Sequence, residues 1–189
     1  MNKNILYSFV LLLSTACLFS FDLPKGWFPS GDATKSYDMG IDKGMGRDGK
    51  NVATIKSNTK KISGFGTLMQ TAIPDKYLGK RVRMSGYVKS ENVAEWAGLW
   101  FRVDQKDKRA AAFDNMQDRA IKGTTGWKRY EIVLDVAQNS SNLAYGALLS
   151  GTGQIWFDDI QFEIVENTVP LTGGDINALE EPRNLDFEN

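Results

Sequence analysis

The middle of the chain carries the residue types that recognise a ligand most readily. Residues 97–104 (AGLWFRVD) alternate in polarity, which predicts a strand with Trp100, Arg102 and Asp104 on one face. An indole ring can stack on a flat ligand, and Arg, Asn and Asp side chains can grip hydroxyl groups in a fixed geometry. We therefore expect a binding face on this strand and on the polar segment that follows it. Its candidate residues are Trp96, Trp100, Arg102, Asp114, Asn115 and Arg119.

A solvated outer face is the competing interpretation of the same strand. An exposed pair of Arg102 and Asp104 would then contribute little to stability. The binding interpretation predicts that loss of Trp100 abolishes binding and leaves the fold intact. In both interpretations Ala97, Leu99, Phe101 and Val103 point into the core, because side chains alternate between the faces of a strand.

The composition removes several kinds of catalysis. The chain has no histidine, which excludes Ser-His and Cys-His nucleophiles and His-ligated zinc. Carboxylate chemistry remains, and a glycosidase needs two carboxylates that face each other across a cleft at a set separation. Nothing in the sequence pairs two of them. The candidates are Glu95, Asp104, Asp114, Asp118, Glu131, Asp158 and Asp159.

The first 20 residues have the pattern of an export signal. Lys3 supplies a positive charge, residues 5–13 form an apolar run, and small residues precede Cys17. The run is short for a membrane-spanning helix. The sequence STAC at 14–17 leaves two alternatives: lipidation of Cys17, or simple cleavage that releases a free protein. We expect an exported protein of the bacterial envelope, in the periplasm, at the cell surface or secreted, with membrane contact only through a lipid on Cys17.

Charge and cysteine content narrow the class of protein further. The 189-residue chain has 23 basic and 23 acidic residues, so it lacks the basic excess of a nucleic-acid binder. Its single cysteine lies in the signal segment, which leaves the folded part without disulfides or thiol chemistry. A chain of this length can bury a core without such links.

Short alternating segments with Gly, Asn and Ser between them predict an all-β fold. No convincing amphipathic helix interrupts them, which is the pattern of a sandwich or barrel. We expect a β-sandwich domain over residues 21–166, and an acidic, mobile tail over residues 167–189. The predicted strands include 52–56, 64–69, 80–89, 97–104, 110–116, 127–136, 143–150 and 154–165.

Three of these segments carry a family resemblance. GKRVRMSGYVKS, GWKRYEIVLDV and IWFDDIQFEIV resemble, in order and spacing, strands of carbohydrate-binding modules of the galactose-binding-like jelly-roll type. The resemblance covers residues 21–165. It implies a jelly-roll β-sandwich that binds a carbohydrate or another extracellular ligand.

The same resemblance implies a structural calcium ion. In these modules an acidic residue of the last strand often helps to hold calcium, together with oxygen atoms from the beginning of the domain, and calcium prefers hard oxygen ligands. The alternative is that an aspartate caps a turn or pairs with a lysine. The candidate ligands are Asp158, Asp159, Asp22 and Asp42.

A narrower resemblance is to an uncharacterised bacterial group that shares LWFRVD, FDNM, GTTGW and LLSGTGQIWFDD. Some members of that group are labelled transcription regulators. The present sequence has no evident helix-turn-helix and no basic stripe, so we expect no nucleic-acid partner.

Together these observations favour an exported, non-catalytic β-sandwich that binds carbohydrate. A structural or protein-interaction domain at the cell envelope is the alternative from another class, and a carboxylate-dependent glycosidase is a third. Fold resemblance alone does not decide among them.

Overall fold

A computed structural model describes residues 21–106 and 110–173. The predicted signal segment, Cys17 and the tail beyond Gly173 lie outside the described residues. The strands are β1 (Phe28–Ser30), β2 (Tyr37–Asp42), β3 (Val52–Ser57), β4 (Phe65–Ala72), β5 (Lys80–Gln105), β6 (Ala110–Asp114), β7 (Ile121–Val136), β8 (Ser140–Ser150) and β9 (Gln154–Val165). Three short 3₁₀ turns lie at Thr34–Ser36, Asp75–Tyr77 and Gln117–Arg119. The described residues contain no helix long and apolar enough to cross a membrane.

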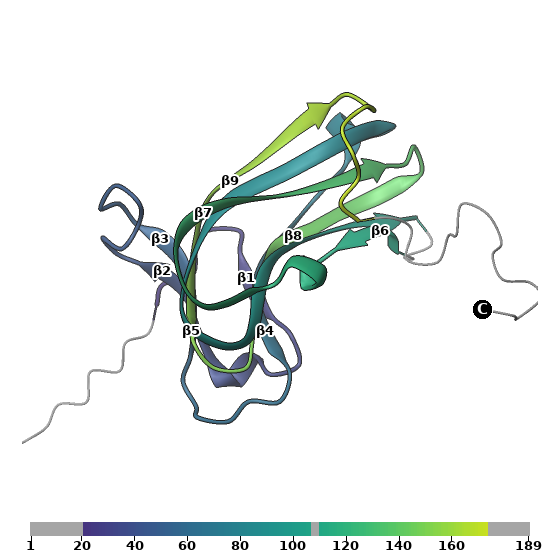
Figure 1. The fold of residues 1–189 in the computed structure, drawn as a ribbon. Helices are drawn as coiled ribbons and strands as arrows, with labels where there is room; N and C mark the ends of the chain where they lie inside the picture. Colours follow the sequence, from purple (N-terminus) through teal and green to yellow (C-terminus); the bar gives the residue numbers. More distant parts are fainter. Residues whose placement is uncertain (1–20, 107–109, 174–189) are drawn as a thin grey trace, which may run out of the picture.

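The long strand β5 belongs to both layers of a β-sandwich. Its first half pairs with β7 and β9, and its second half pairs with β8 and β6. We call β1, β4, β8, the second half of β5 and β6 the front sheet. The back sheet consists of β2, β3, β9, the first half of β5 and β7. Figure 1 shows β5, β7 and β9 curving together from one end of the molecule to the other.

The sequence predicts two strands, 80–89 and 97–104, where the structure has one continuous strand. Residues 90–96 (SENVAEW) look like a connecting turn because they are polar. Asn92 takes a left-handed conformation, with φ of 52°, and the pairing of β5 with β7 shifts register between Val88 and Ala97. These irregularities bend the strand without ending it. The bend places the second half of β5 in the front sheet.

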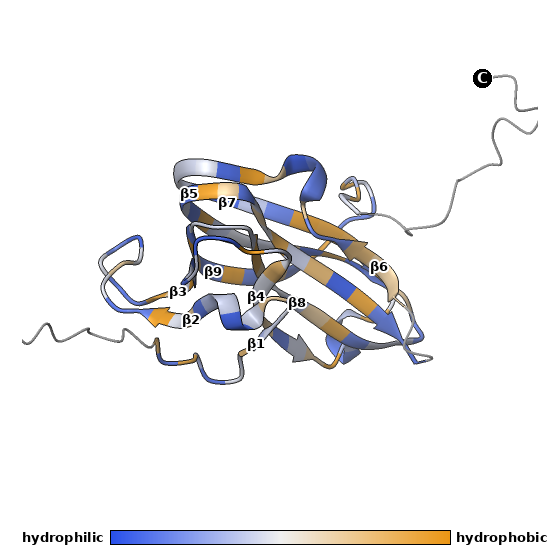
Figure 2. Cartoon of the chain, turned by 90° about the horizontal axis from the view of Figure 1, so that it is seen from below, coloured by the Kyte–Doolittle hydropathy of each residue, from blue (hydrophilic) through white to orange (hydrophobic). Residues whose placement is uncertain are grey.

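The core lies between the two sheets and follows the alternation of the strands. Ala97, Leu99, Phe101 and Val103 are fully buried, which confirms the direction predicted for them. Phe162 of β9 connects the layers, since its ring lies 5.4 Å from that of Phe101, edge to face. Apolar and polar bands alternate along the strands in Figure 2. The all-β sandwich predicted from the sequence is therefore confirmed.

Candidate ligand-binding groove

A groove lies on the outer face of the front sheet, on the side away from the core. Its volume is about 660 Å³, which is within the usual range of small-molecule sites. Aromatic and aliphatic side chains form most of its lining, with a few polar groups among them. The lining includes Phe28, Asp32, Phe65, Thr67, Trp96, Trp100, Arg102, Phe113, Asn115 and Leu148.

Strand register brings these residues together. Phe28 on β1 lies opposite Met69 on β4, Met69 lies opposite Gly146 on β8, and Gly146 lies opposite Trp100 on β5. Side chains two residues apart share one face of a strand, so Trp96 and Arg102 extend the same face. Gly146 lets β4 approach closely, because a Cβ atom there would lie 2.3 Å from the carbonyl oxygen of Leu68.

Trp100 forms the floor of the groove. Its side chain is only 7% exposed and packs against Ala144 and Leu148. The indole N–H donates a hydrogen bond of 2.7 Å to the hydroxyl of Thr67, which in turn donates to the carbonyl of Ala147. Truncating so deeply buried a ring leaves a cavity and costs about 3–5 kcal/mol. This burial changes the expectation for Trp100, because its loss would now destabilise the fold as well as the site.

The rings that a ligand can reach lie around this floor. Phe28 and Phe65 are 42% and 37% exposed, and Trp96 is half-buried. Phe113 adds a partly buried ring on β6. Sequence reasoning missed Phe28, Phe65 and Phe113. For Phe65 the signal is that a large aromatic residue alternates with the buried Gly66 and Leu68 and so points outward.

Arg102 presents a rigid, planar donor at one side of the groove. Its Nε and Nη2 atoms lie 2.7 and 3.1 Å from the two carboxylate oxygens of Asp104. Asp104 is largely buried and also accepts a hydrogen bond from the amide of Asn142. The Arg102 side chain is 44% exposed, so the pair holds a guanidinium in a fixed position at the surface. The solvated-face and binding interpretations predicted for this strand are therefore both compatible with the pair.

Asn115 supplies an amide at the end of β6. It follows Phe113 at a spacing of two residues, and both line the groove. The Oδ1 atom of Asn115 accepts the backbone N–H of Gln117 at 3.1 Å, which fixes the side chain. A left-handed Met116, with φ of 61°, turns the chain away immediately afterwards.

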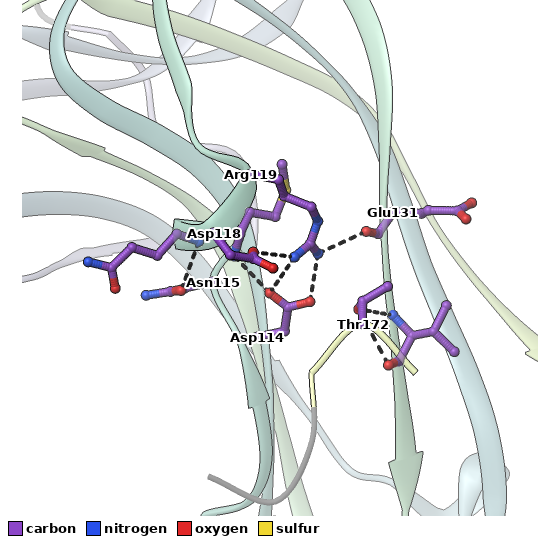
Figure 3. A network of polar contacts seen from close by, with 9 residues as sticks. Asp114, Asn115, Asp118, Arg119, Glu131 and Thr172 are labelled. Atoms are coloured by element: carbon purple, nitrogen blue, oxygen red, sulfur yellow. Dashed lines mark hydrogen bonds and ion pairs between the residues drawn. The ribbon is translucent and has the colours of Figure 1, made fainter. Parts of the chain in front are cut away.

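Asp114 and Arg119, which the sequence groups with the binding face, form an ion pair behind β6. Asp114 points to the opposite side of the strand from Phe113, as alternation requires. Its Oδ2 atom lies 2.6 Å from Nη2 of Arg119, and the Asp114 side chain is only 5% exposed. Arg119 also donates to the backbone carbonyl of Glu131 on β7 (Figure 3). The structure thus gathers four of the six candidate residues in the groove and places these two elsewhere.

Hydrogen bonds keep Asp114 ionised despite its burial. Burial alone would raise the pKa of Asp114, but hydrogen bonds from Arg119, Thr172 and the N–H of Met116, with the charge of Arg119, hold that pKa below its ordinary value. A carboxylate whose pKa is depressed in the folded state stabilises the fold above its unfolded pKa. That contribution is lost as the pH falls through the folded pKa.

Acid should therefore lower the stability of the fold, in part by protonating Asp114. We expect the wild type to lose this stability below about pH 4, the ordinary value for aspartate. The Asp114→Asn variant should begin less stable at neutral pH and lose less on acidification. Thermal unfolding between about pH 7 and about pH 3 gives the stability of each protein as a curve against pH. Parallel curves for the two proteins would show that Asp114 titrates alike in the folded and unfolded chain.

The four candidate calcium ligands have other neighbours. Asp22 pairs with Lys43 at 3.2 Å, and Asp159 pairs with Arg47 at 3.0 Å. Asp42 accepts the indole N–H of Trp156 at 2.8 Å, and Asp158 accepts the backbone N–H of Asp159. In the part of the chain that the structure describes, no three His, Cys, Asp or Glu side chains come together as metal ligands. The calcium site stays a prediction from sequence.

Comparison with known proteins supports the fold and leaves the family open. No family model matches the chain. It is 44% identical over 167 residues to a Bacillus subtilis (strain 168) protein described as an uncharacterized HTH-type transcriptional regulator, YbfP. The match covers 87% of this chain and 57% of that protein, so the chain spans little more than half the length of its curated relative.

Several solved structures share the architecture. The xylan-binding CBM22-1 domain of Paenibacillus barcinonensis Xyn10C has a TM-score of 0.53 and 18% identity, covering 77% of this chain and 90% of that domain. The C-terminal family 22 module of Clostridium thermocellum Xyn10B has a TM-score of 0.52 and 8% identity, covering 74% and 87%. The enzymatically active domain of bacteriophage CBA120 tailspike protein 4 has a TM-score of 0.57 and 14% identity, covering 75% and 20%. At such low sequence identity, these structural similarities establish the jelly-roll fold and nothing about function.

Proposed function

We propose that the protein is an exported, non-catalytic module that binds a carbohydrate chain in the groove of the front sheet. The observation that carries this proposal is the lining itself. Reachable aromatic rings of Phe28, Phe65 and Trp96 surround a tryptophan floor, and Arg102 and Asn115 present planar polar groups beside them. A sugar ring offers an apolar C–H face and a rim of hydroxyl groups, which these two kinds of side chain complement.

The charges of the groove favour an uncharged ligand. Arg102 is the cation of the lining, and Asp104 neutralises it through two hydrogen bonds. A uronic acid or phosphate would have to compete with that buried carboxylate for the guanidinium. A neutral polysaccharide can accept hydrogen bonds from the outer N–H groups of Arg102 without breaking the pair. Two of the similar structures are described by their binding to xylan, which makes neutral plant-type polysaccharides the first to test.

The carboxylates around the groove support the proposal of binding without catalysis. Asp32 is the acidic residue among the described lining residues, and its Oδ1 atom accepts the backbone N–H of Phe65 at 2.7 Å. Glycoside hydrolysis by the usual route needs two carboxylates facing each other across the bound sugar. The lining therefore supports recognition of a sugar chain better than its cleavage.

A panel of soluble and insoluble polysaccharides tests the proposal. Affinity electrophoresis and pull-down with the purified protein should reveal retardation by at least one neutral polysaccharide, with and without added calcium. Ile73→Ala provides a control, because Ile73 is the most exposed large apolar side chain described, at 74%, and lies outside the groove. Failure of the folded protein to bind any member of the panel would contradict the proposal. The apolar groove would then be better explained by a protein partner.

A further inference from the structure

After the last strand and Glu166, the next seven residues turn back onto the sandwich. We call residues 167–173 the C-terminal clasp. Arg81 on β5 fixes its beginning: Nη1 donates to the backbone carbonyls of Asn167 and Val169 at 2.6 and 2.7 Å. The same guanidinium is held by Asp135 through Nε and Nη2, at 2.8 and 2.9 Å. The clasp therefore begins on a rigid support in the back sheet.

The end of the clasp lies along β7. The backbone N–H of Thr172 donates to the carbonyl of Val133 at 3.1 Å, and the N–H of Val133 donates to the Thr172 hydroxyl at 2.8 Å. These two bonds satisfy the main chain of β7 at Val133, which is almost fully buried. Figure 3 shows Thr172 beside this strand, close to Asp114.

The same end of the clasp contacts β6 of the front sheet. A Cβ atom built on Gly173 would lie 2.5 Å from both Cβ of Asp114 and the carbonyl oxygen of Phe113, so glycine is required for this approach. The Thr172 hydroxyl also contributes to the low pKa of Asp114. The clasp thus touches β7 on one side and β6 on the other.

Two connections therefore join β6 to the back sheet behind the groove. One is Arg119, which contacts Asp114 and the carbonyl of Glu131 on β7. The other is the end of the clasp. The opposite side of β6 carries Phe113, and Asn115 follows at its end, and both line the groove. The five-residue strand pairs with β5 along its other edge.

We propose that the clasp fixes β6 and thereby sets the position of the groove wall formed by Phe113 and Asn115. Thr172 and Gly173 are positioning residues in this arrangement. The Thr172 hydroxyl holds the end of the clasp on Val133 of β7, and Gly173 allows its close approach to β6. The role in ligand affinity rests on the proposed function, whereas the role in holding β6 does not. Thr172 and Gly173 lie outside the groove lining, so their effect on binding must pass through β6.

The test compares Thr172→Val, which removes the hydroxyl, with Thr172→Ser, which keeps it. Thr168→Val is the matched control, because Thr168 is exposed within the same clasp. Hydrogen exchange of the peptide covering residues 110–120 is measured without ligand in all four proteins. We expect about tenfold faster exchange in Thr172→Val, because the buried N–H of Val133 loses its acceptor and the end of the clasp is released, and wild-type exchange in the other two variants. Gly173→Ala should resemble Thr172→Val.

Titration with xylohexaose, or with the best polysaccharide of the panel, provides the second readout. The proposal predicts several-fold weaker affinity for Thr172→Val, with recovery in Thr172→Ser. Unchanged exchange of β6 in Thr172→Val, even with a lower melting temperature, would overturn the proposal and reduce the clasp to a cover for β7. Faster exchange with unchanged affinity would overturn the effect on the groove wall. Failure of the wild type to bind any glycan would contradict the proposed function, and the exchange experiment would still decide whether the clasp holds β6.

Discussion

Replacing Trp96 by alanine is expected to weaken carbohydrate binding by at least about 30-fold. Truncation of an aromatic anchor at the centre of a binding site costs about 2 kcal/mol or more, which corresponds to that change in affinity. Trp96 is the large ring best placed for this role. It lines the groove and is half-buried, whereas Trp100 beneath it is almost inaccessible. Isothermal titration of both proteins with the same polysaccharide measures the difference.

The fold should survive this substitution. Trp96 lies in the outer, partly buried layer of the small cluster around Trp100, and its loss opens space toward solvent. The melting temperature of Trp96→Ala should therefore stay close to that of the wild type. Phe65→Ala is a second test on β4, with a smaller expected loss because the ring is smaller. Wild-type affinity in both variants would show that the ligand does not stack in this groove.

Replacing Arg119 by methionine is expected to destabilise the protein by about 2–3 kcal/mol. Removing one partner of a buried pair leaves the other charge uncompensated, which typically costs 3–5 kcal/mol. We expect about 2–3 kcal/mol rather than 3–5 kcal/mol because the pair is only partly buried. The Arg119 side chain is 32% exposed, whereas that of Asp114 is 5% exposed. In a chain of this size the loss corresponds to a fall in melting temperature of roughly 6–10 °C.

Arg129→Met is the matched control for Arg119→Met. Arg129 pairs with Glu131 at 3.0 Å, but both side chains are more than 40% exposed. Exposed pairs contribute about 0–1 kcal/mol, so this variant should melt within a few degrees of the wild type. Equal losses in the two variants would contradict the assignment of Asp114 and Arg119 as a buried structural pair. Chemical denaturation with both proteins provides the comparison.

Alternation along the strands allowed much of the fold to be predicted from the sequence. The inward direction of Leu99 and Phe101 follows from a period of two, and the structure confirms it. The bend in β5 could not be predicted, because it depends on a left-handed Asn92 within a polar stretch that looks like a turn. Local sequence does not reveal that the same strand continues in the other sheet.

The groove was predictable only in part, for a related reason. Trp100 and Arg102 lie on the predicted strand 97–104, so alternation alone places them on a common face. Trp96 joins that face because β5 continues through residues 90–96. Phe28 and Phe65 come from β1 and β4, far away in the sequence, and only strand order brings them to the same groove. Register between distant strands is set by the whole sheet rather than by local pattern.

Asp114 and Arg119 show the limit of assigning function by residue type. Both have the chemistry of a ligand-binding group, and both lie within six residues of Phe113 and Asn115. A shift of one position along β6 changes the face, so Asp114 points inward to Arg119. Thr172, which belongs to the same network, lies in the segment 167–189 that the sequence predicts to be a mobile tail. Residues 167–173 instead pack against the sandwich, through contacts that only the folded chain brings together.

The most direct test of the central claim is the indole N–H spectrum during titration with a bound polysaccharide. The chain has five tryptophans, which give five separate probes. The signals of Trp96 and Trp100 in the groove should shift on binding. The signal of Trp156 should stay in place, because that ring lies in the back sheet, is 3% exposed and donates to Asp42. A shift confined to Trp156, with Trp96 and Trp100 unchanged, would contradict carbohydrate binding in the groove of the front sheet.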